Sequence, residues 1–262
     1  MTFREDFVEA DGFRIRYLEV GSGPMLIHLH GAGGLRLSRA YDLLAERYRV
    51  IAFEMPGFGN SPENTRSTTS PEMAATMAAA VSALGIETFN LWGTSLGAKI
   101  ALWLAIQAPE RVTALVLAAP AAIRPTDAKG PPSGSPEQMA RLLYAHPDRM
   151  PPLTAPDPAV AAQTRRLVMQ LAGPNRDAAL EVRMRELETP ALAVFGTHDR
   201  VIPPELGRCY KQLLPNGYLA FLYDTAHRLD AERPEAFVEI VGDFLARHDA
   251  FVIRRTESLI LP

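Results

Sequence analysis

Leu91-Trp92-Gly93-Thr94-Ser95-Leu96-Gly97-Ala98 is the segment of the sequence that most strongly indicates a fold. Its apolar beginning is typical of a buried strand, and its end is typical of the first turn of a helix. The motif Gly-x-Ser-x-Gly lies between them. A serine hydroxyl is a weak nucleophile, so a protein that uses one must hold it at a sharp corner, near a base and amide donors. Gly93 and Gly97 permit that corner, because a side chain at either position would collide where the helix folds back onto the strand. The alternative interpretation is a turn of small residues without a chemical role.

The composition is that of an ordinary globular protein. The chain has 262 residues, of which 47% are apolar and 22% are charged, and this predicts one main domain. A net charge of −3 without a basic stripe argues against nucleic acid and against an anionic membrane surface as partners. We therefore expect a small-molecule substrate, and the sequence leaves a homodimer open.

Cysteine usage and apolar runs bear on the cellular location. Cys209 is the single cysteine, which excludes an internal disulfide framework and a multi-cysteine zinc site. The first residues include acids where a signal peptide has an apolar run, and no stretch reaches the ~18 apolar residues of a membrane span. These features predict a cytoplasmic protein without a membrane span.

Strand and helix patterns alternate along most of the chain. Residues 3–9 and 13–20 alternate apolar and polar side chains, which predicts an antiparallel hairpin. Later strands are nearly all apolar, as in a parallel sheet covered on both faces. We expect strands at 25–29, 49–54, 88–93, 112–118, 191–195 and 218–223, helices at 38–48, 70–84, 96–108, 204–213 and 233–247, and an edge strand at 251–254.

This alternation fails in the middle of the chain. Ten prolines fall between Pro120 and Pro158, and helical patterns at 136–146, 158–172 and 175–186 lie between or after these breakers. We expect residues 121–188 to form an inserted helical lid, and residues 1–120 and 189–262 to form the core domain. Apolar lid residues are expected to line a substrate pocket together with Gly33: Met139, Leu142, Leu143, Tyr144, Met150 and Leu153. Arg165 and Arg166 either recognise a substrate carboxylate or form a solvated helix face.

Loops at the carboxyl ends of parallel strands converge on one crevice. Ser95 is the candidate nucleophile, His227 the candidate base, and Asp199 the candidate acid that orients the imidazole. The candidate oxyanion donors are the backbone N–H groups of Ala32 and Leu96. No histidine and carboxylate cluster has metal-ligand spacing, and we expect no cofactor.

We expect the other histidines and acids near these loops to have structural roles. We expect His28 to be a core residue and His30 to brace the glycine loop at 30–34. Glu54 is expected to bond loop backbone, and Asp224 and Asp230 are too close to His227 in sequence to approach its ring easily.

Five motifs together resemble the α/β-hydrolase superfamily. They are His30-Gly31-Ala32-Gly33, Pro56-Gly57-Phe58-Gly59-Asn60-Ser61, Gly93-Thr94-Ser95-Leu96-Gly97, Gly196-Thr197-His198-Asp199, and His227 with the later Glu232-Arg233-Pro234. The resemblance implies an eight-stranded, mostly parallel sheet flanked by helices, a cofactor-free Ser-His-Asp site, and a helical cap after the sixth strand.

Departures from the family pattern reduce the number of activities that the sequence is compatible with. Haloalkane dehalogenases and epoxide hydrolases of this superfamily carry aspartate at the elbow, so Ser95 argues against both. Carbon–carbon hydrolases of aromatic ring-cleavage products typically have tryptophan after the histidine, where this chain has Arg228. The family often has aspartate in place of Glu54, which concerns loop architecture.

The sequence thus predicts a serine hydrolase that cleaves a small, largely apolar carboxylic ester through an acyl-enzyme. The alternatives are a carbon–carbon bond hydrolase of ring-cleavage-type diketones and a low-turnover ligand receptor on the same fold. Nucleotide binding is disfavoured, because the glycine loop lacks both the G-x-G-x-x-G spacing and a helix-opening lysine.

Overall fold

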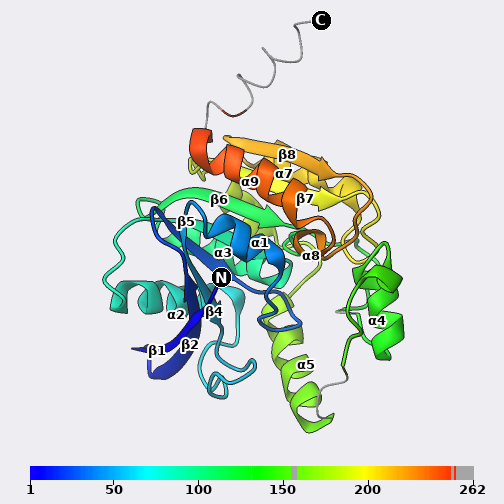
Figure 1. Cartoon of the computed structure of the whole chain (residues 1–262), viewed down its shortest axis with the longest axis horizontal. Helices are drawn as coiled ribbons and strands as arrows, with labels where there is room; N and C mark the ends of the chain where they lie inside the picture. The colour runs from blue at the N-terminus through cyan, green and yellow to red at the C-terminus, as the bar shows by residue number, and fades with distance from the viewer. Residues whose placement is uncertain (131, 155–157, 249–250, 252–262) are drawn as a thin grey trace, which may run out of the picture.

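The computed structural model describes residues 1–130, 132–154, 158–248 and 251. These residues contain an eight-stranded sheet flanked by helices, so the predicted α/β architecture is confirmed (Figure 1). The strand order is β1-β2-β4-β3-β5-β6-β7-β8. Their bounds are Arg4–Ala10, Phe13–Val20, Met25–Leu29, Arg49–Glu54, Phe89–Thr94, Val112–Ala118, Ala191–Gly196 and Gly217–Leu222 for β1 to β8.

Strand direction follows from the connections. β1 and β2 form the predicted antiparallel hairpin, and β2 pairs antiparallel with β4. From β4 onward all neighbouring strands are parallel, because a helical connection returns the chain to the same end of the sheet. β5 and β7 are buried along their whole length, as their apolar sequences require.

Helices cover both faces of the sheet. α1 (Arg39–Leu44), α8 (Leu229–Glu232) and α9 (Pro234–Arg247) contact one another on one face. α2 (Ser70–Ala83), α3 (Leu96–Gln107) and α7 (Gly207–Leu213) contribute to the apolar core on the other. Figure 1 shows α1, α8 and α9 in front of the sheet and α3 behind it.

The chain between β6 and β7, residues 119–190, is called the inserted segment below. Its helices are α4 (Pro136–Leu143), η1 (Pro147–Arg149), α5 (Pro158–Ala172) and α6 (Ala178–Met184). α4 stands apart from the sheet at one side of the molecule (Figure 1). α4 is shorter than the predicted 136–146, because the backbone of Tyr144 is extended, and α6 starts later than the predicted residue 175, because the Asp177 side chain caps it.

Two buried cations hold the end of α5, one from the core and one from the start of the inserted segment. Lys99 Nζ, on α3, donates to the carbonyl oxygen of Ala172 at 2.8 Å. Arg124 Nη2 donates to the carbonyl oxygen of Gly173 at 2.6 Å. The last carbonyls of a helix have no partner inside the helix, so these two side chains supply one. Burial lowers the pKa of both groups.

Two further expectations concern the C-terminal part. Phe251 is helical and packs in the core, so it does not belong to the predicted edge strand, and residues 252–254 lie outside the described residues. The 204–213 helix begins as the short 3-10 helix η2 (Pro204–Leu206) before α7. In the part of the chain that the structure describes, no helix combines the length and apolar character that crossing a bilayer needs.

Candidate active site

The corner between β5 and α3 holds Ser95 in an unusual backbone conformation. Its φ is 54° and its ψ is −113°, a region that residues with side chains seldom adopt. The conformation is fixed on both sides, because Ser95 N donates to the carbonyl of Ala118 at 2.9 Å and Ser95 O accepts from Ala98 N at 3.1 Å. Such strain persists only where surrounding structure enforces it, and it is common at functional sites.

The two motif glycines let helix and strand approach this closely. A Cβ built on Gly93 would lie 2.5 Å from Ala98 Cα. A Cβ on Gly97 would collide with the carbonyl oxygens of Leu29 and His30 at the end of β3. Both contacts are with backbone, which cannot move aside easily, so the sequence motif corresponds to a steric requirement of the corner.

The three predicted side chains meet in one hydrogen-bonded relay. His227 Nε2 lies 2.9 Å from Ser95 Oγ, and His227 Nδ1 lies 2.9 Å from Asp199 Oδ2. Residues 95, 199 and 227 are all buried. They follow β5, β7 and β8, so parallel strands bring together groups that are up to 132 positions apart.

The Asp199 carboxylate is held from both sides. Its Oδ1 accepts hydrogen bonds from the backbone N–H groups of Val201 and Ile202, at 2.8 and 2.9 Å. The other oxygen therefore faces the imidazole, and its 2.9 Å contact with Nδ1 favours the tautomer with a proton on that nitrogen. Nε2 is then free to accept a proton from the serine hydroxyl.

The glycine loop lies directly over Ser95. A Cβ on Gly31 would be 3.2 Å from Ser95 Cβ, so the loop backbone approaches the serine closely. His30 braces this loop as predicted: its Nε2 accepts from Met55 N at 3.1 Å, and its Nδ1 donates to Gly31 O at 2.8 Å. Burial lowers the pKa of His30 to about 4, so the imidazole is neutral at physiological pH.

The two residues predicted to donate to an oxyanion lie close to the serine in the chain or in the cavity. Leu96 is the first residue of α3, where backbone N–H groups point outward without intrahelical partners. Ala32 follows Gly31 and lines the cavity beside Ser95. Ala32 lies in the β3–α1 connection and Leu96 at the start of α3, so an oxyanion hole formed by their N–H groups stays a prediction.

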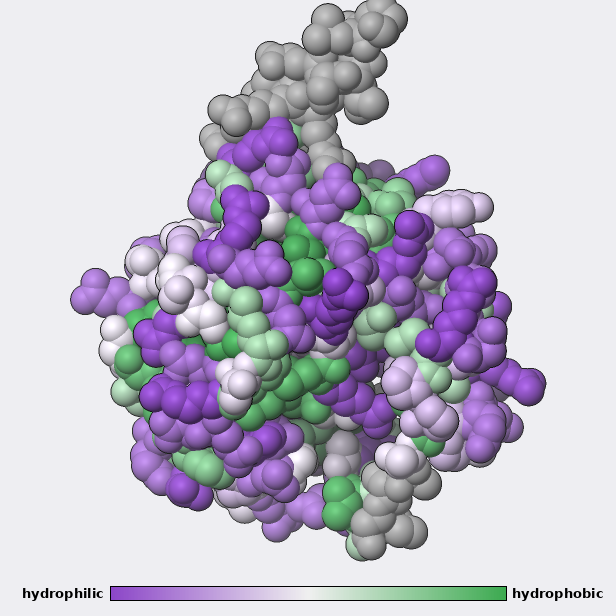
Figure 2. Space-filling model, viewed as in Figure 1, coloured by the Kyte–Doolittle hydropathy of each residue, from purple (hydrophilic) through white to green (hydrophobic). Residues whose placement is uncertain are grey.

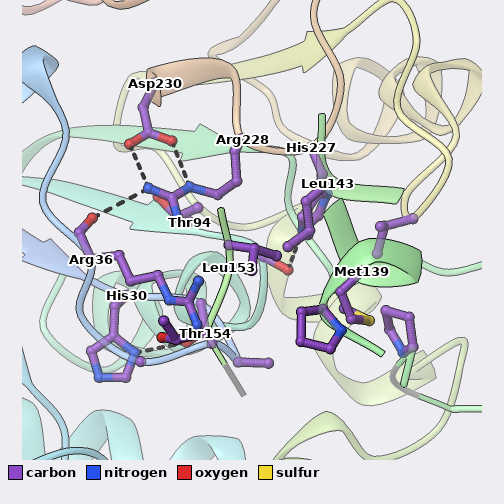
Figure 3. Close-up of a pocket in the computed structure, with 18 of the residues that line it drawn as sticks. His30, Arg36, Thr94, Met139, Leu143, Leu153, Thr154, His227, Arg228 and Asp230 are labelled. Atoms are coloured by element: carbon purple, nitrogen blue, oxygen red, sulfur yellow. Dashed lines mark hydrogen bonds and ion pairs between the residues drawn. The ribbon is translucent and has the colours of Figure 1, made fainter. Parts of the chain in front are cut away.

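A cavity of about 280 Å³ opens over Ser95 and His227. Of the predicted pocket residues, Gly33, Met139, Leu143 and Leu153 line it (Figure 3). Figure 2 shows the surface hollowed between α4 and the rest of the molecule, with hydrophobic residues gathered in the middle of this face.

Other predicted pocket residues lie elsewhere. Leu142 and Tyr144 are not among the lining residues. Leu142 is rotated by about 100° around the helix from Leu143, and Tyr144 is buried where the chain leaves α4. Met150 lines a separate cavity, and Arg165 and Arg166 are exposed on α5, away from the lining.

Comparison with known families agrees with this geometry. The family model described as "alpha/beta hydrolase fold" matches residues 24–157, just over half of the chain. The chain belongs to the α/β hydrolase family.

Relatives of this α/β hydrolase differ in activity. A 2-hydroxymuconate semialdehyde hydrolase of Pseudomonas sp. (strain CF600) is 30% identical over 267 residues, which cover 93% of this chain and 94% of the relative. The dihydrolipoyllysine-residue acetyltransferase component of the acetoin cleaving system of Cupriavidus necator is 36% identical over 117 residues, which are 44% of this chain and only 31% of that protein. A solved membrane phospholipase A matches with a TM-score of 0.80 at 27% identity, covering 93% of this chain and 86% of that one.

One end of the cavity of this α/β hydrolase is charged, which sequence reasoning missed. Arg228 Nε lies 3.1 Å from Asp230 Oδ1, and Arg228 Nη2 donates to the carbonyl of Arg36 at 3.3 Å. Burial opposes the charge on Arg228, but Asp230 outweighs it and raises the arginine pKa. Figure 3 shows this pair opposite Met139 and Leu143. The available signal was the position of Arg228 directly after His227.

The floor of the cavity is polar but uncharged. His28 is buried as predicted, yet it also lines the cavity, where Tyr41 Oη lies 3.0 Å from its Nδ1 and Thr94 Oγ1 lies 3.2 Å from its Nε2. Burial lowers the pKa of His28 to about 3. This histidine is therefore a neutral hydrogen-bonding group.

The other acids that could have taken the place of Asp199 have different partners. Glu54 Oε2 accepts from Asn60 N at 2.7 Å, the expected contact with loop backbone. Asp224 pairs with His146 at 2.8 Å, and Asp230 pairs with Arg228. Among the residues placed by the structure, no group of three His, Cys, Asp or Glu side chains is arranged to hold a metal ion.

Proposed function

We propose that this chain is a serine hydrolase that cleaves a small carboxylic ester through an acyl-enzyme on Ser95. The observation that carries the proposal is the 2.9 Å contact between His227 Nε2 and Ser95 Oγ, continued by the 2.9 Å contact to Asp199. A relay of this geometry generates a nucleophile without a cofactor.

Each side chain has one role in the proposed reaction. Ser95 Oγ attacks the ester carbonyl while His227 Nε2 takes the hydroxyl proton, and Asp199 stabilises the resulting imidazolium. The N–H groups of Ala32 and Leu96 donate to the oxyanion of the tetrahedral intermediate. His227 then gives its proton to the leaving alcohol. Water attacks the acyl-enzyme by the same steps, releasing the acid and restoring Ser95.

The cavity supports a small substrate with an apolar part. Its volume is about 280 Å³, at the small end for ligand pockets. Met139 and Leu143 on α4, with Leu153, form its apolar side. In this proposal residues 121–188 act as a lid over the core domain, 1–120 and 189–262, and their side chains select the substrate.

A second candidate is hydrolysis of a carbon–carbon bond in a ring-cleavage-type diketone. The observation in its favour is the charged end of the cavity, where the guanidinium groups of Arg36 and Arg228 line the wall. Such groups suit a substrate carboxylate, and muconate, in the name of the 30% identical relative, is a carboxylate. The arginine at position 228, where ring-cleavage hydrolases typically have tryptophan, keeps this candidate second.

Parallel assays of the wild type and Ser95→Ala test the proposal. We expect hydrolysis of p-nitrophenyl acetate or butyrate, and a loss of roughly 10⁴-fold or more in kcat for Ser95→Ala. Equal activity of the two proteins would eliminate the mechanism. A preference of 100-fold or more for a vinylogous diketone acid would favour the second candidate, and tight ligand binding with negligible turnover would favour a receptor.

A further inference from the structure

The inserted segment touches both loops that carry the relay. Arg200 Nη1, next to Asp199, donates to the carbonyl of Arg141 at 2.8 Å. Arg228 N, next to His227, donates to the carbonyl of Leu143 at 3.0 Å. Figure 3 shows Leu143 beside His227. The end of α4 is therefore bonded directly to the neighbours of two relay residues.

Residues 223–228, between β8 and α8, are called the histidine loop below because they contain His227. The carboxylate of Glu232 joins this loop to residues 145–146 of the inserted segment, and this contact is called the junction. Glu232 Oε1 accepts from the backbone N–H groups of Ala145 and His146, at 2.8 and 3.1 Å. Its Oε2 accepts from Ala226 N at 2.7 Å, one residue before His227. The two oxygens thus hold opposite sides of the same junction.

The junction needs an acceptor with two oxygens. Because Tyr144 leaves the helical conformation, the N–H groups of Ala145 and His146 turn away from α4 and toward Glu232. A carboxylate is acceptor-only, and its hydrogen bonds are stronger than those of a neutral group. An amide offers one oxygen, so it satisfies one side and presents an N–H group to donors on the other.

We propose that Glu232 is a positioning residue that couples docking of residues 141–146 to the placement of His227 against Ser95. This rests on the proposed function, because it assigns Glu232 a part in the reaction of the same site. When the segment is docked, Ala226 N is fixed and the imidazole stays at 2.9 Å from Ser95 Oγ. When the junction opens, the histidine loop loses this restraint and the relay loosens.

A second contact at the junction is more exposed. His146 Nε2 lies 2.8 Å from Asp224 Oδ1, and both side chains are about one-third or more exposed, at 33% and 39%. Solvent screening weakens such a pair, so we assign the coupling to Glu232.

Glu232→Gln is the direct test, with Glu235→Gln as the matched control. Glu235 lies three residues on, is exposed, and pairs with Arg39 at the surface. At a temperature where circular dichroism shows each variant folded, we expect kcat of Glu232→Gln for p-nitrophenyl butyrate to fall about tenfold to 100-fold, with KM changed less than threefold. The kcat of the control stays within twofold of wild type. Amide hydrogen exchange is expected to accelerate in peptides containing residues 145–146 or 226.

A folded Glu232→Gln with wild-type kcat would overturn the coupling, as would loss of stability with unchanged kcat. If Glu232→Gln does not fold, Ala145→Pro replaces it, because proline removes one N–H donor and the extended Tyr144 tolerates a following proline. The same fall in kcat is expected, and wild-type kcat would refute the coupling. Activity that survives Ser95→Ala refutes the proposed function, whereas an inactive Ser95→Ala with a normal Glu232→Gln refutes the coupling alone.

Discussion

The two sides of the cavity are held in place by different forces. The sheet side contains Ser95 and the glycine loop, and its backbone is fixed by parallel pairing of β3 with β5 and by the close packing of Gly93 and Gly97. On the inserted side, α5 packs in the apolar core through Leu167, Val168 and Leu171. α4, which contains Met139 and Leu143, has no buried residue, and the chain after it is held by polar contacts such as those of Glu232. We therefore expect the backbone around Ser95 to be rigid, and the inserted side to influence the relay chiefly through its junction at Glu232.

The largest expected effect comes from the relay on the sheet side. Asp199→Asn keeps the size of the side chain but favours the wrong histidine tautomer, so kcat is expected to fall roughly 10⁴-fold. The unfolding midpoint should change little, because Val201 N and Ile202 N keep an oxygen acceptor. Steady-state kinetics and thermal denaturation measure both. A loss of activity of less than tenfold would contradict the role of Asp199 in orienting His227.

The next effect concerns acid stability of the sheet side. The pKa of His30 is lowered to about 4 in the folded protein, whereas an unfolded histidine titrates near 6.5. The unfolded state therefore binds the proton first, so the stability present above pH 6.5 is lost as the pH falls toward 4. The loss is about 1.4 kcal/mol per pH unit, or roughly 3 kcal/mol over the window.

Urea unfolding at several pH values checks this prediction. We expect His30→Gln to show a slope of stability against pH that is shallower by up to about one proton between pH 6.5 and 4. An unchanged slope would show that His30 does not contribute to acid unfolding.

The smallest effect concerns the attachment of the inserted segment. Lys99→Met keeps the apolar stem but removes the donor to Ala172 O, which should lower the free energy of unfolding by about 1–3 kcal/mol. Because Lys99 holds the end of α5 and not the junction at Glu232, we expect this contact to be separable from the relay, so that KM rises several-fold while kcat stays within twofold. Lys211→Met is the matched control, because Lys211 also donates to a backbone carbonyl, that of Gly217, but away from the inserted segment. A fall in kcat without a change in KM would contradict the separation.

The sequence predicted the sheet side because its motifs sit at strand ends. Gly93 and Gly97 mark a steric requirement, and Ser95, Asp199 and His227 each follow an apolar strand, so their meeting follows from parallel topology. All eight strands were predicted within a residue or two at each end.

The inserted side was predicted less well, because its path depends on contacts between distant residues. The apolar pattern of 139–144 reveals neither that Tyr144 turns out of the helix nor which side of α4 faces the cavity, so it did not show that Leu142 and Tyr144 are absent from the lining. Arg36 lines the same cavity as Arg228, 192 positions away, and Glu232 meets Ala145 across 87 positions. No local spacing encodes either contact.

Covalent labelling with a fluorophosphonate, located by peptide mass spectrometry, shows whether Ser95 is the activated nucleophile. We predict one adduct per chain on Ser95, absent from Ser95→Ala and formed much more slowly in Asp199→Asn. An adduct on another residue, or an equal labelling rate in all three proteins, would contradict the relay of residues 95, 199 and 227.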